Sequence, residues 1–182
     1  SGQTVMVTGA GGSIGSELCR QIARFGVARL VCVDVSEFAM YQIEQELREA
    51  HSQMQGFYYT ANVREPDRLH AIAMRHRPVV VFHAAAYKHV PLMEDLNEIE
   101  ALRTNVLGTS NVARVAGQCG AARFVQVSTD KAVNPTNIMG ASKRLCEMVI
   151  QMMNRESKTE FVAVRFGNVL GSNGSVIPLF KK

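Results

Sequence analysis

The 182-residue sequence has no apolar run close to the roughly 20 residues that a membrane-spanning helix needs. Its 20 lysines and arginines against 16 acidic residues leave a net charge of only +4, and they are scattered rather than gathered into a stripe with interleaved aromatics. This distribution argues against a nucleic-acid surface but allows a small anionic ligand. We therefore expect a globular chain whose residues contact neither membrane nor nucleic acid.

Cysteine is also scarce, and the four that occur form no Cys-x-x-Cys pair: Cys19, Cys32, Cys119 and Cys146. Three of them fall inside helix-like or strand-like apolar patterns, where a free thiol packs as a small hydrophobic side chain. This predicts reduced, buried thiols, a cytoplasmic setting and no metal site. The chain runs directly from Ser1-Gly2 into a strand pattern, so we expect no signal peptide.

Short runs rich in Val, Ile and Phe alternate with longer segments of helical period, which is typical of a parallel sheet with crossover helices. Val79-Val80-Val81-Phe82 is apolar at every position, which indicates burial on both faces of the strand. We therefore expect an α/β fold of the doubly wound, Rossmann type in a single domain. Six strands are predicted: Thr4 to Thr8, Arg29 to Asp34, Gly56 to Thr60, Val79 to Ala84, Arg123 to Ser128 and Glu160 to Arg165.

Apolar residues at steps of three and four predict a helix after each of the first five strands, with that stripe facing the sheet. The predicted stripes are Ile14, Leu18, Ile22 and Phe25; Met40, Ile43 and Leu47; Leu69, Ile72 and Ala73; Leu96, Ile99, Leu102, Val106 and Val112 in a long fourth helix; and Leu145, Met148 and Met152.

The first predicted strand leads into a loop in which Gly9, Gly12 and Gly15 are three residues apart. Between a strand and a helix, one glycine permits the sharp turn, another lets the backbone approach a pyrophosphate, and the third lets the helix pack close to the strand. The helix N-terminus, here Ser13 and Ile14, adds N–H donors and positive dipole. The loop is therefore a candidate dinucleotide site, with a purely structural glycine loop as the alternative.

Asp34 closes the second predicted strand, where a carboxylate can accept hydrogen bonds from the adenosine ribose hydroxyls. It would repel a 2′-phosphate, and no arginine follows directly, so the pattern favours NAD over NADP. The alternative is that Asp34 only begins a turn with Ser36, which is itself a candidate cofactor contact.

A polar segment follows the fifth predicted strand, Thr129-Asp130-Lys131, and Met139 to Lys143 opens the helix after it. Ligands of doubly wound folds bind at the carboxyl ends of the strands, so this triplet is placed to project into the cleft. The structural alternative is a solvated turn before Pro135.

Five motifs occur in order along the chain: the glycine loop, His83-Ala84-Ala85-Ala86-Tyr87-Lys88-His89-Val90-Pro91, Asn105-Val106-Leu107-Gly108-Thr109, Ser128-Thr129-Asp130-Lys131 and Arg165-Phe166-Gly167-Asn168-Val169. Together they resemble an extended short-chain dehydrogenase/reductase over nearly the whole chain. The sequence is most similar to the polysaccharide-biosynthesis branch of UDP-N-acetylglucosamine 4,6-dehydratases. The resemblance implies a lyase that uses NAD and a UDP-sugar in bacterial polysaccharide or glycan biosynthesis, such as that of capsule or O-antigen, and that forms a homo-oligomer through its long fourth helix.

The sequence departs from most short-chain dehydrogenases, which have Tyr-x-x-x-Lys, because Met139 stands four residues before Lys143. A thioether has no proton to give or take, so Met139 cannot be the base that ionises the sugar hydroxyl. The long, membrane-anchored dehydratases are similar in having methionine here while keeping the Thr-Asp-Lys triplet. The resemblance therefore points to another group as the base rather than to a dead enzyme, and to the cytoplasmic face of the inner membrane if the full-length protein is anchored.

The resemblance also implies the roles of the site residues in a reaction that oxidises sugar C4, eliminates water across C5 and C6, and returns the hydride to C6. Asp130 would protonate the departing C6 hydroxyl and could exchange protons with the C4 hydroxyl. Lys131 would take the C5 proton as a neutral amine, its pKa lowered by desolvation beside Lys143 or the nicotinamide. Thr129 would hydrogen-bond the C4 oxygen, and Lys143 would hold the nicotinamide ribose and stabilise the oxyanion.

Further contacts follow from the same resemblance. The cofactor would meet Asn62 and Val63 at the adenine, pass along Ala84, Ala85 and Ala86, and contact Ser128, with Asn105 ordering the site. The substrate would be contacted by Lys88, and its diphosphate by Asn168, Ser172 and Ser175. His83 is interpreted as a structural histidine.

Two other functions stay open on the sequence alone. A nucleotide-sugar 4-epimerase shares the fold and the first oxidation but needs no elimination acid and base, so Asp130 and Lys131 argue against it. A non-catalytic dinucleotide-binding sensor is compatible with the lost tyrosine. The chain ends without a terminating pattern, so we expect residues 1–166 to be the NAD-binding domain, residues 167–182 to begin a truncated substrate-binding region, and the chain alone to bind NAD but turn over poorly.

Overall fold

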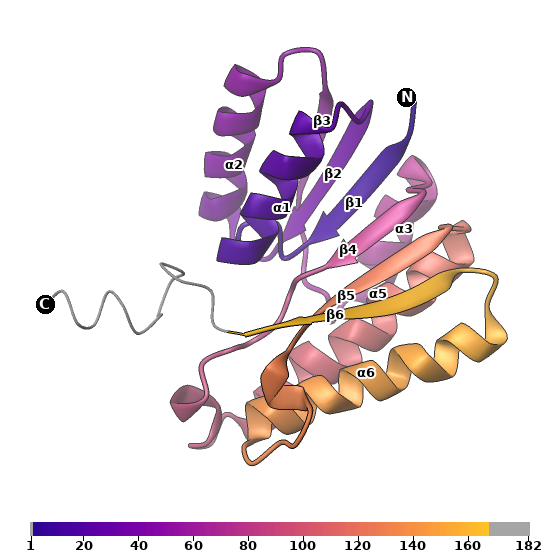
Figure 1. The fold of residues 1–182 in the computed structure, drawn as a ribbon. Coiled ribbons are helices and arrows are strands. Elements are labelled where there is room, and N and C mark those ends of the chain that lie inside the picture. Colours follow the sequence, from indigo (N-terminus) through magenta and orange to yellow (C-terminus); the bar gives the residue numbers. More distant parts are fainter. Residues whose placement is uncertain (1, 168–182) are drawn as a thin grey trace, which may run out of the picture.

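A computed structural model describes residues 2–167, which form a six-stranded parallel sheet in the order β3-β2-β1-β4-β5-β6 (Figure 1). The predicted Rossmann-type fold is confirmed, and the predicted strands agree with the observed ones to within one residue at each end. The strands are β1 (Thr4–Thr8), β2 (Arg29–Asp34), β3 (Gln55–Thr60), β4 (Val80–His83), β5 (Arg123–Thr129) and β6 (Glu160–Phe166).

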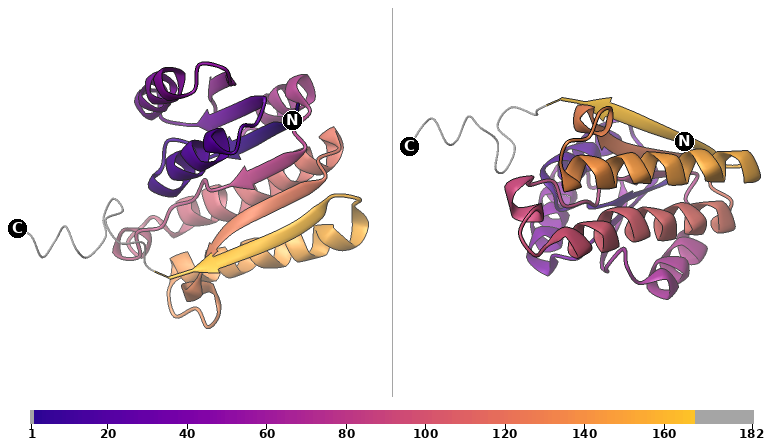
Figure 2. Two further views of the ribbon diagram at one scale, coloured as in Figure 1. Left: turned by 45° about the horizontal axis from the view of Figure 1, so that its top comes forward. Right: turned by 90° about the horizontal axis from the view of Figure 1, so that it is seen from below.

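Helices cover both faces of this sheet, as the continuously buried central strands β1 and β2 require (Figures 1 and 2). One face carries α1 (Ser13–Arg24) and α2 (Glu37–Ala50). The other carries α3 (Pro66–His76), α5 (Gly108–Cys119) and α6 (Ile138–Glu156). The shorter segments are η1 (Pro91–Met93), α4 (Glu98–Ala101), the π-helical η2 (Leu102–Leu107) and η3 (Asp130–Ala132).

The sheet divides the buried apolar side chains into two clusters, one under each layer of helices. The larger cluster contains Phe124 of β5, which is fully buried and has ring contacts to His83 at 6.0 Å and Phe161 at 5.3 Å. All four cysteines are buried and free, as predicted. None of the helices within residues 2–167 is long and apolar enough to cross a membrane.

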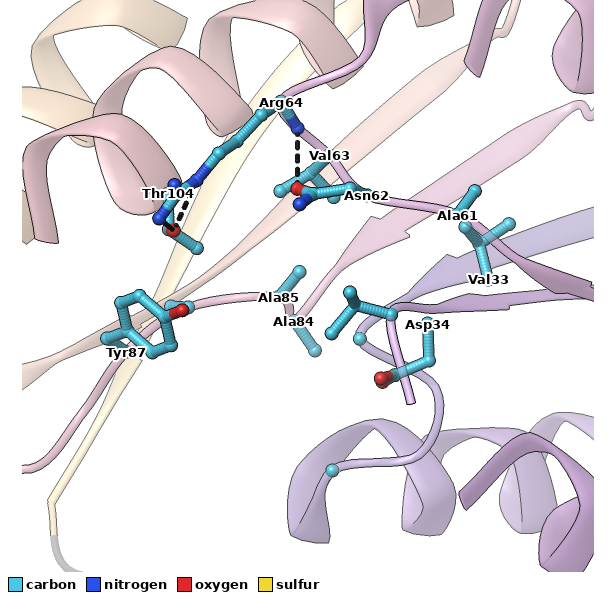
Figure 3. A pocket seen from close by; sticks show the side chains of 14 residues that line it. Val33, Asp34, Ala61, Asn62, Val63, Arg64, Ala84, Ala85, Tyr87 and Thr104 are labelled. Carbon is cyan, nitrogen blue, oxygen red and sulfur yellow. Dashed lines mark hydrogen bonds between the residues drawn. The ribbon is translucent and has the colours of Figure 1, made fainter. Parts of the chain in front are cut away.

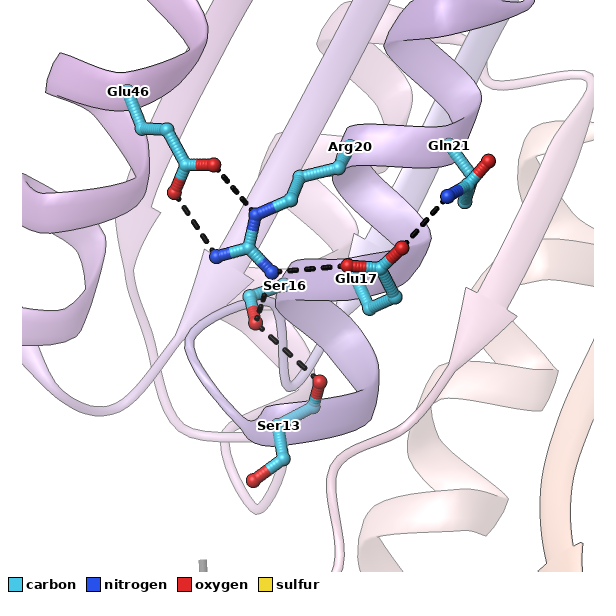
Figure 4. A network of polar contacts seen from close by, with 6 residues as sticks. All are labelled: Ser13, Ser16, Glu17, Arg20, Gln21 and Glu46. Atoms are coloured by element: carbon cyan, nitrogen blue, oxygen red, sulfur yellow. Dashed lines mark hydrogen bonds and ion pairs between the residues drawn. The ribbon is translucent and has the colours of Figure 1, made fainter. Parts of the chain in front are cut away.

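A polar network on the outer surface fixes α1 against α2 (Figure 4). The Arg20 guanidinium donates to both carboxylate oxygens of Glu46, at 2.5 Å and 2.9 Å, and also to Glu17 at 3.2 Å. Arg20 and Glu46 lie in the second halves of α1 and α2, so this fork joins the two helices away from the ends of β1 and β2. Because the pair is partly exposed, it contributes only about 1 kcal/mol or less to stability.

One of the predicted apolar stripes points away from the sheet. Leu145, Met148 and Met152 are exposed on α6, whose sheet-facing side instead carries polar residues such as Lys143 and Glu147. The periodicity identified the helix correctly but gave the wrong buried face, because the strands beneath α6 end in polar site residues.

The long fourth helix and the end of the first also differ from the prediction. Leu96 is 89% exposed and precedes the helix, and Ile99 and Leu102 are exposed because the π-helical η2 shifts the phase of the apolar stripe. Phe25 lies just past the end of α1 and is 85% exposed.

Replacing Phe124 by alanine should lower the free energy of unfolding by about 3–5 kcal/mol, because it leaves a cavity between two aromatic rings. Phe25→Ala is the matched control and should change stability by no more than about 0.5 kcal/mol. Urea unfolding followed by circular dichroism measures both. Equal effects of the two substitutions would contradict the packing described for β5.

Candidate functional site

The glycine loop is held in close contact with three elements. Gly9 has a φ of +73°, and a Cβ there would overlap the backbone of Ala84 and Ala85 after β4. A Cβ on Gly15 would overlap the carbonyl of Gly9, so α1 begins directly against the loop. The N–H groups of Gly9 and Ala10 donate to the Val33 carbonyl at 2.8 Å and 3.1 Å. The loop is therefore fixed by β2, β4 and α1 together.

Gly12 is different, because the packing of the chain does not demand a glycine there. Its φ of −73° suits any residue, and the nearest atom to an added Cβ is the Gly9 carbonyl oxygen at 3.3 Å. Gly12 is also the N-cap of α1 and brings no side chain to the first turn, Ser13 to Ser16, which carries no acidic residue. The backbone donors and dipole of this turn suit an anion, so the loop fits a pyrophosphate.

Asp34, at the end of β2, is anchored beside the loop. Its Oδ2 accepts from the Gly11 N–H and its Oδ1 from the Ser36 N–H, both at 2.9 Å. A carboxylate has about four acceptor sites, so lone pairs remain for ribose hydroxyls. The Ser36 hydroxyl, by contrast, accepts from the Ala39 N–H at 3.2 Å and caps α2, so the side chain that we predicted as a cofactor contact is used within the protein.

A pocket opens at the carboxyl ends of the strands and brings together many of the predicted cofactor residues (Figure 3). These are Gly9, Gly12, Asp34, Asn62, Val63, Ala84, Ala85 and Ala86. The pocket also contains residues that the sequence interpretation missed: Val33, Val35, Ala61, Arg64, Tyr87 and Thr104. Most of these are sequence neighbours of predicted residues, but Thr104 comes from η2, and no local signal pointed to it.

Arg64 forms one wall of the pocket. Its guanidinium donates to the Thr104 hydroxyl at 2.9 Å and 2.5 Å and pairs with Glu100 at 2.6 Å, while its backbone N–H donates to the Asn62 Oδ1 at 3.0 Å (Figure 3). The loop after β3 is thereby tied to the helix after β4, which keeps the wall in place.

Asn105 connects the pocket to α6. It is buried, and its side-chain amide accepts from the Tyr87 N–H at 2.8 Å and donates to the Tyr87 carbonyl at 3.1 Å and the Ser142 hydroxyl at 2.9 Å. The buried amide of Asn105 therefore finds its hydrogen-bond partners within the protein. Through these bonds Asn105 joins Tyr87 to the start of α6.

The Thr129-Asp130-Lys131 triplet lies where β5 ends and η3 begins. The Thr129 hydroxyl donates to the Asp130 Oδ1 at 2.9 Å, and the Lys131 ammonium lies 3.2 Å from the same oxygen. Hydrogen bonds from Thr129 and Lys131 lower the pKa of Asp130, so its carboxylate is ionised at neutral pH. The Lys131 side chain is 37% exposed.

The first turn of α6 packs directly against this triplet. A Cβ on Gly140 would approach the Lys131 carbonyl oxygen to 2.6 Å, so only glycine allows the contact without displacement. Met139 is buried, with 4% of its surface exposed. Within the residues that the structure describes, an apolar and buried side chain therefore occupies the position that tyrosine takes in most short-chain dehydrogenases.

Lys143 is buried one turn further along α6. Its ammonium donates to the Val127 carbonyl at 2.6 Å, and burial lowers its pKa. The adjacent Ser128 hydroxyl donates to the Glu147 carboxylate at 2.7 Å, so it too is used within the protein. Neither Lys143 nor Ser128 lines the pocket of Figure 3.

His83, at the end of β4, is fully buried and structural, as interpreted from the sequence. Its Nδ1 lies 2.6 Å from the Thr8 hydroxyl and its Nε2 lies 3.1 Å from the Thr109 hydroxyl. The ring thus joins the strand before the glycine loop to α5. Burial, with a smaller effect of Lys143, lowers the pKa of His83 to about 3.

The remaining predicted residues lie elsewhere. Lys88 is exposed and does not line the pocket. Asn168, Ser172 and Ser175 lie outside the described residues. No group of three or more potential metal ligands occurs within residues 2–167.

Comparison with known proteins identifies the family. The family model described as "Polysaccharide biosynthesis protein" matches residues 5–182. The chain belongs to this family. It is 53% identical over 181 residues to the capsular polysaccharide biosynthesis protein CapD of Staphylococcus aureus, covering 98% of this chain and 30% of CapD. It is 32% identical over 186 residues to a Campylobacter jejuni UDP-N-acetylglucosamine 4,6-dehydratase (inverting), covering 100% of this chain and 54% of that protein.

A solved structure, Pen from Bacillus thuringiensis, superimposes with a TM-score of 0.89 at 34% identity, covering 98% of this chain and 56% of that chain. UDP-glucose 4-epimerases are among the other relatives. The family of extended short-chain dehydrogenases/reductases that the sequence resembled is thereby confirmed, as is its link to nucleotide-sugar enzymes. The chain spans between about a third and about half of the relatives just named.

The low pKa of His83 makes the stability of the fold depend on pH. The unfolded histidine binds a proton below pH about 6.5, whereas the folded one does so only near pH 3. Stability should therefore be fully present above about pH 6.5 and fall with decreasing pH, by about 1.4 kcal/mol at pH 5.5. Urea unfolding at about pH 8, where the His83 effect is complete, and at about pH 5.5 measures this difference. His83→Gln should remove this part of the pH dependence; an unchanged slope would contradict a neutral buried His83.

Proposed function

We propose that the protein is an NAD-dependent UDP-N-acetylglucosamine 4,6-dehydratase that acts in bacterial polysaccharide biosynthesis. The observation that carries the proposal is the set of hydrogen bonds at the end of β5. There one carboxylate oxygen of Asp130 accepts from both the Thr129 hydroxyl and the Lys131 ammonium. An elimination needs an acid and a base side by side, and this triplet supplies both. The likeness to a dehydratase at 32% identity supports the same assignment.

The pocket residues fit NAD. The first turn of α1 offers backbone donors to the pyrophosphate, Asp34 retains lone pairs for the ribose, and its charge disfavours a 2′-phosphate. Asn62 and Val63 would contact the adenine, and Ala84 to Ala86 would pass along the cofactor towards the triplet. Bound NAD would accept a hydride from sugar C4 and return it to C6.

Asp130 can replace the missing tyrosine as the base. Because its lowered pKa keeps it ionised, its carboxylate can take the proton of the C4 hydroxyl, directly or through Thr129, as the C4–H bond breaks. The protonated Asp130 then gives this proton to the C6 hydroxyl, which leaves as water. One carboxylate thus serves first as base and then as acid, and ends ionised as it began.

Lys131 completes the proton balance. Its ammonium first releases a proton to solvent. The neutral amine then takes the C5 proton, which the C4 ketone makes removable, and it returns a proton to C5 when hydride reaches C6. The net change is loss of one water from the sugar. Lys143, held by the Val127 carbonyl, would hold the nicotinamide ribose and stabilise charge on the C4 oxygen.

We further infer that the protein forms a homo-oligomer at the cytoplasmic side of the membrane. The exposed apolar side chains Ile99, Leu102, Leu107, Leu145, Met148 and Met152 lie on two adjacent helical segments, η2 with α4 and α6, and suit a contact between copies.

Turnover of UDP-N-acetylglucosamine by the full-length protein tests the activity. The product should be lighter by one water, and in heavy water it should carry one deuterium at C5, because the C5 proton comes from Lys131. Asp130→Asn and Lys131→Met should each lower kcat by about 100-fold or more, whereas exposed Lys158→Met should not. Mass spectrometry separates the outcomes. A product of equal mass would indicate a 4-epimerase, and unchanged sugar a sensor; either would refute the dehydratase.

Gly12→Ala tests the pyrophosphate site. The added Cβ should weaken NAD binding at least about tenfold by filling the anion space, yet change stability by less than about 1 kcal/mol, because the backbone angles suit alanine. Gly117→Ala, inside α5, is the matched control and should bind NAD normally. Calorimetry measures affinity and urea unfolding measures stability. Undiminished NAD affinity in Gly12→Ala would remove the loop from the cofactor site.

A further inference from the structure

Glu147 is a buried carboxylate that the proposed reaction does not use. It lies on the sheet-facing side of α6, and its side chain is 2% exposed. Oε1 accepts from the Ser128 hydroxyl at 2.7 Å and the Arg165 Nε at 2.8 Å. Oε2 accepts from the Arg165 Nη2 at 2.6 Å and the Arg144 Nη1 at 3.2 Å. All of its acceptor sites are therefore satisfied, as burial of a charge requires.

These bonds reach the two strands that lead into the site. Ser128 immediately precedes the Thr129-Asp130-Lys131 triplet on β5, and Arg165 is the last but one residue of β6. One turn earlier on α6, the Lys143 ammonium bonds to the carbonyl of Val127. The helix thus holds two consecutive residues at the end of β5, through Lys143 and through Glu147.

The need to pack α6 against β5 and β6 does not by itself explain why a glutamate occupies position 147. Apolar side chains of similar volume usually hold two strands and a helix together as well as a buried ion pair does, and without the desolvation cost. What the carboxylate adds is a fixed geometry. Arg165 donates two hydrogen bonds to it and Ser128 donates one short bond, and such charge-assisted bonds hold their donors at defined positions. A fixed position of the backbone is most important next to groups that must react with a substrate.

We propose that Glu147 is a positioning residue of the site: through Ser128 and Arg165 it fixes the end of β5, so that Thr129, Asp130 and Lys131 meet the sugar at a set distance. The proposal rests on the proposed dehydratase function. Glu147 itself does not line the pocket. A displacement of reacting groups by about 1 Å can cost about 100-fold in rate, so a small loss of alignment here is measurable.

The negative charge of Glu147 has a second effect, on Lys143. Burial lowers the pKa of Lys143, while the thiol of Cys146 and the carboxylate of Glu147 raise it. The other groups that face this ammonium are the Val127 carbonyl on β5 and neutral His83 on β4. Removing the charge of Glu147 lowers the pKa of Lys143 further, because one of the groups that raise it is lost. Activity that needs a charged Lys143 should then be lost at a lower pH.

The test compares Glu147→Gln, Glu147→Asp and the control Glu156→Gln, an exposed acid on the same helix, in the full-length protein. Glu147→Gln should lower kcat at least about tenfold, leave KM for UDP-N-acetylglucosamine and NAD affinity within about threefold, and move the alkaline limb of the pH profile downward. Glu147→Asp, which keeps the charge, should restore the limb and part of kcat. Unchanged kcat and pH profile in Glu147→Gln would overturn the proposal.

A double variant separates positioning from stability. Glu147→Met with Arg165→Met removes both charges and should recover the stability lost in Glu147→Gln, because the buried Glu147 and the 40% exposed Arg165 are then both replaced by apolar side chains. Because the bond to Ser128 is still missing, kcat should stay at least about tenfold low. Recovery of kcat together with stability would reduce Glu147 to a structural role and overturn the proposal.

Amide hydrogen exchange decides the matter even if the wild-type protein does not dehydrate the sugar, an outcome that would refute the proposed function alone. In Glu147→Gln, exchange over residues 128–133 should accelerate at least about tenfold beyond any change in α2, which does not contact Glu147. Equal changes in both segments, or none at residues 128–133, would show that Glu147 does not hold the end of β5.

Discussion

The structure depends on one close contact, the approach of the loop after β1 to α1 and to the chain after β4. Gly15 lies against the Gly9 carbonyl, and Gly9 lies against the backbone of Ala84 and Ala85, with no room for a side chain at either glycine. This contact brings the start of a helix to the carboxyl edge of the sheet between two buried strands. The pocket, Asp34 and the line of small residues after β4 all take their places from it.

The second half of the site is built by α6 in a different way. There polar side chains share the buried face with Met139, Cys146 and Ile150. Lys143 and Glu147 hold the end of β5, and Ser142 is joined through Asn105 to Tyr87 in the pocket wall. Because polar residues take part of the inner face of α6, fewer of its apolar residues can be buried there. Leu145, Met148 and Met152 lie on the outer face, which is the face that we propose for the contact between copies.

The sequence predicted the sheet and the pocket well, because both depend on local patterns. Uninterrupted apolar runs identified the strands, and the glycine spacing and Asp34 identified the pocket. Contacts between distant segments were not predictable: Thr104 reaches the pocket from η2, and Glu147 is bonded to two strands. Periodicity also failed for Leu145 and its neighbours, since it reports which side of a helix is apolar and not what covers that side.

The loss of the usual tyrosine is consistent with this architecture. Met139 is buried in the first turn of α6, and Gly140 brings that turn against the Lys131 backbone. The ionised Asp130 at the end of β5 is the group that we propose as the base. The account stands on the alignment of a bound dinucleotide with this triplet. A crystal structure of the full-length protein with NAD tests it most directly. The account predicts the pyrophosphate at the first turn of α1 and the nicotinamide beside Thr129, Asp130 and Lys131; a dinucleotide bound elsewhere, or a triplet turned away from the ring, would contradict it.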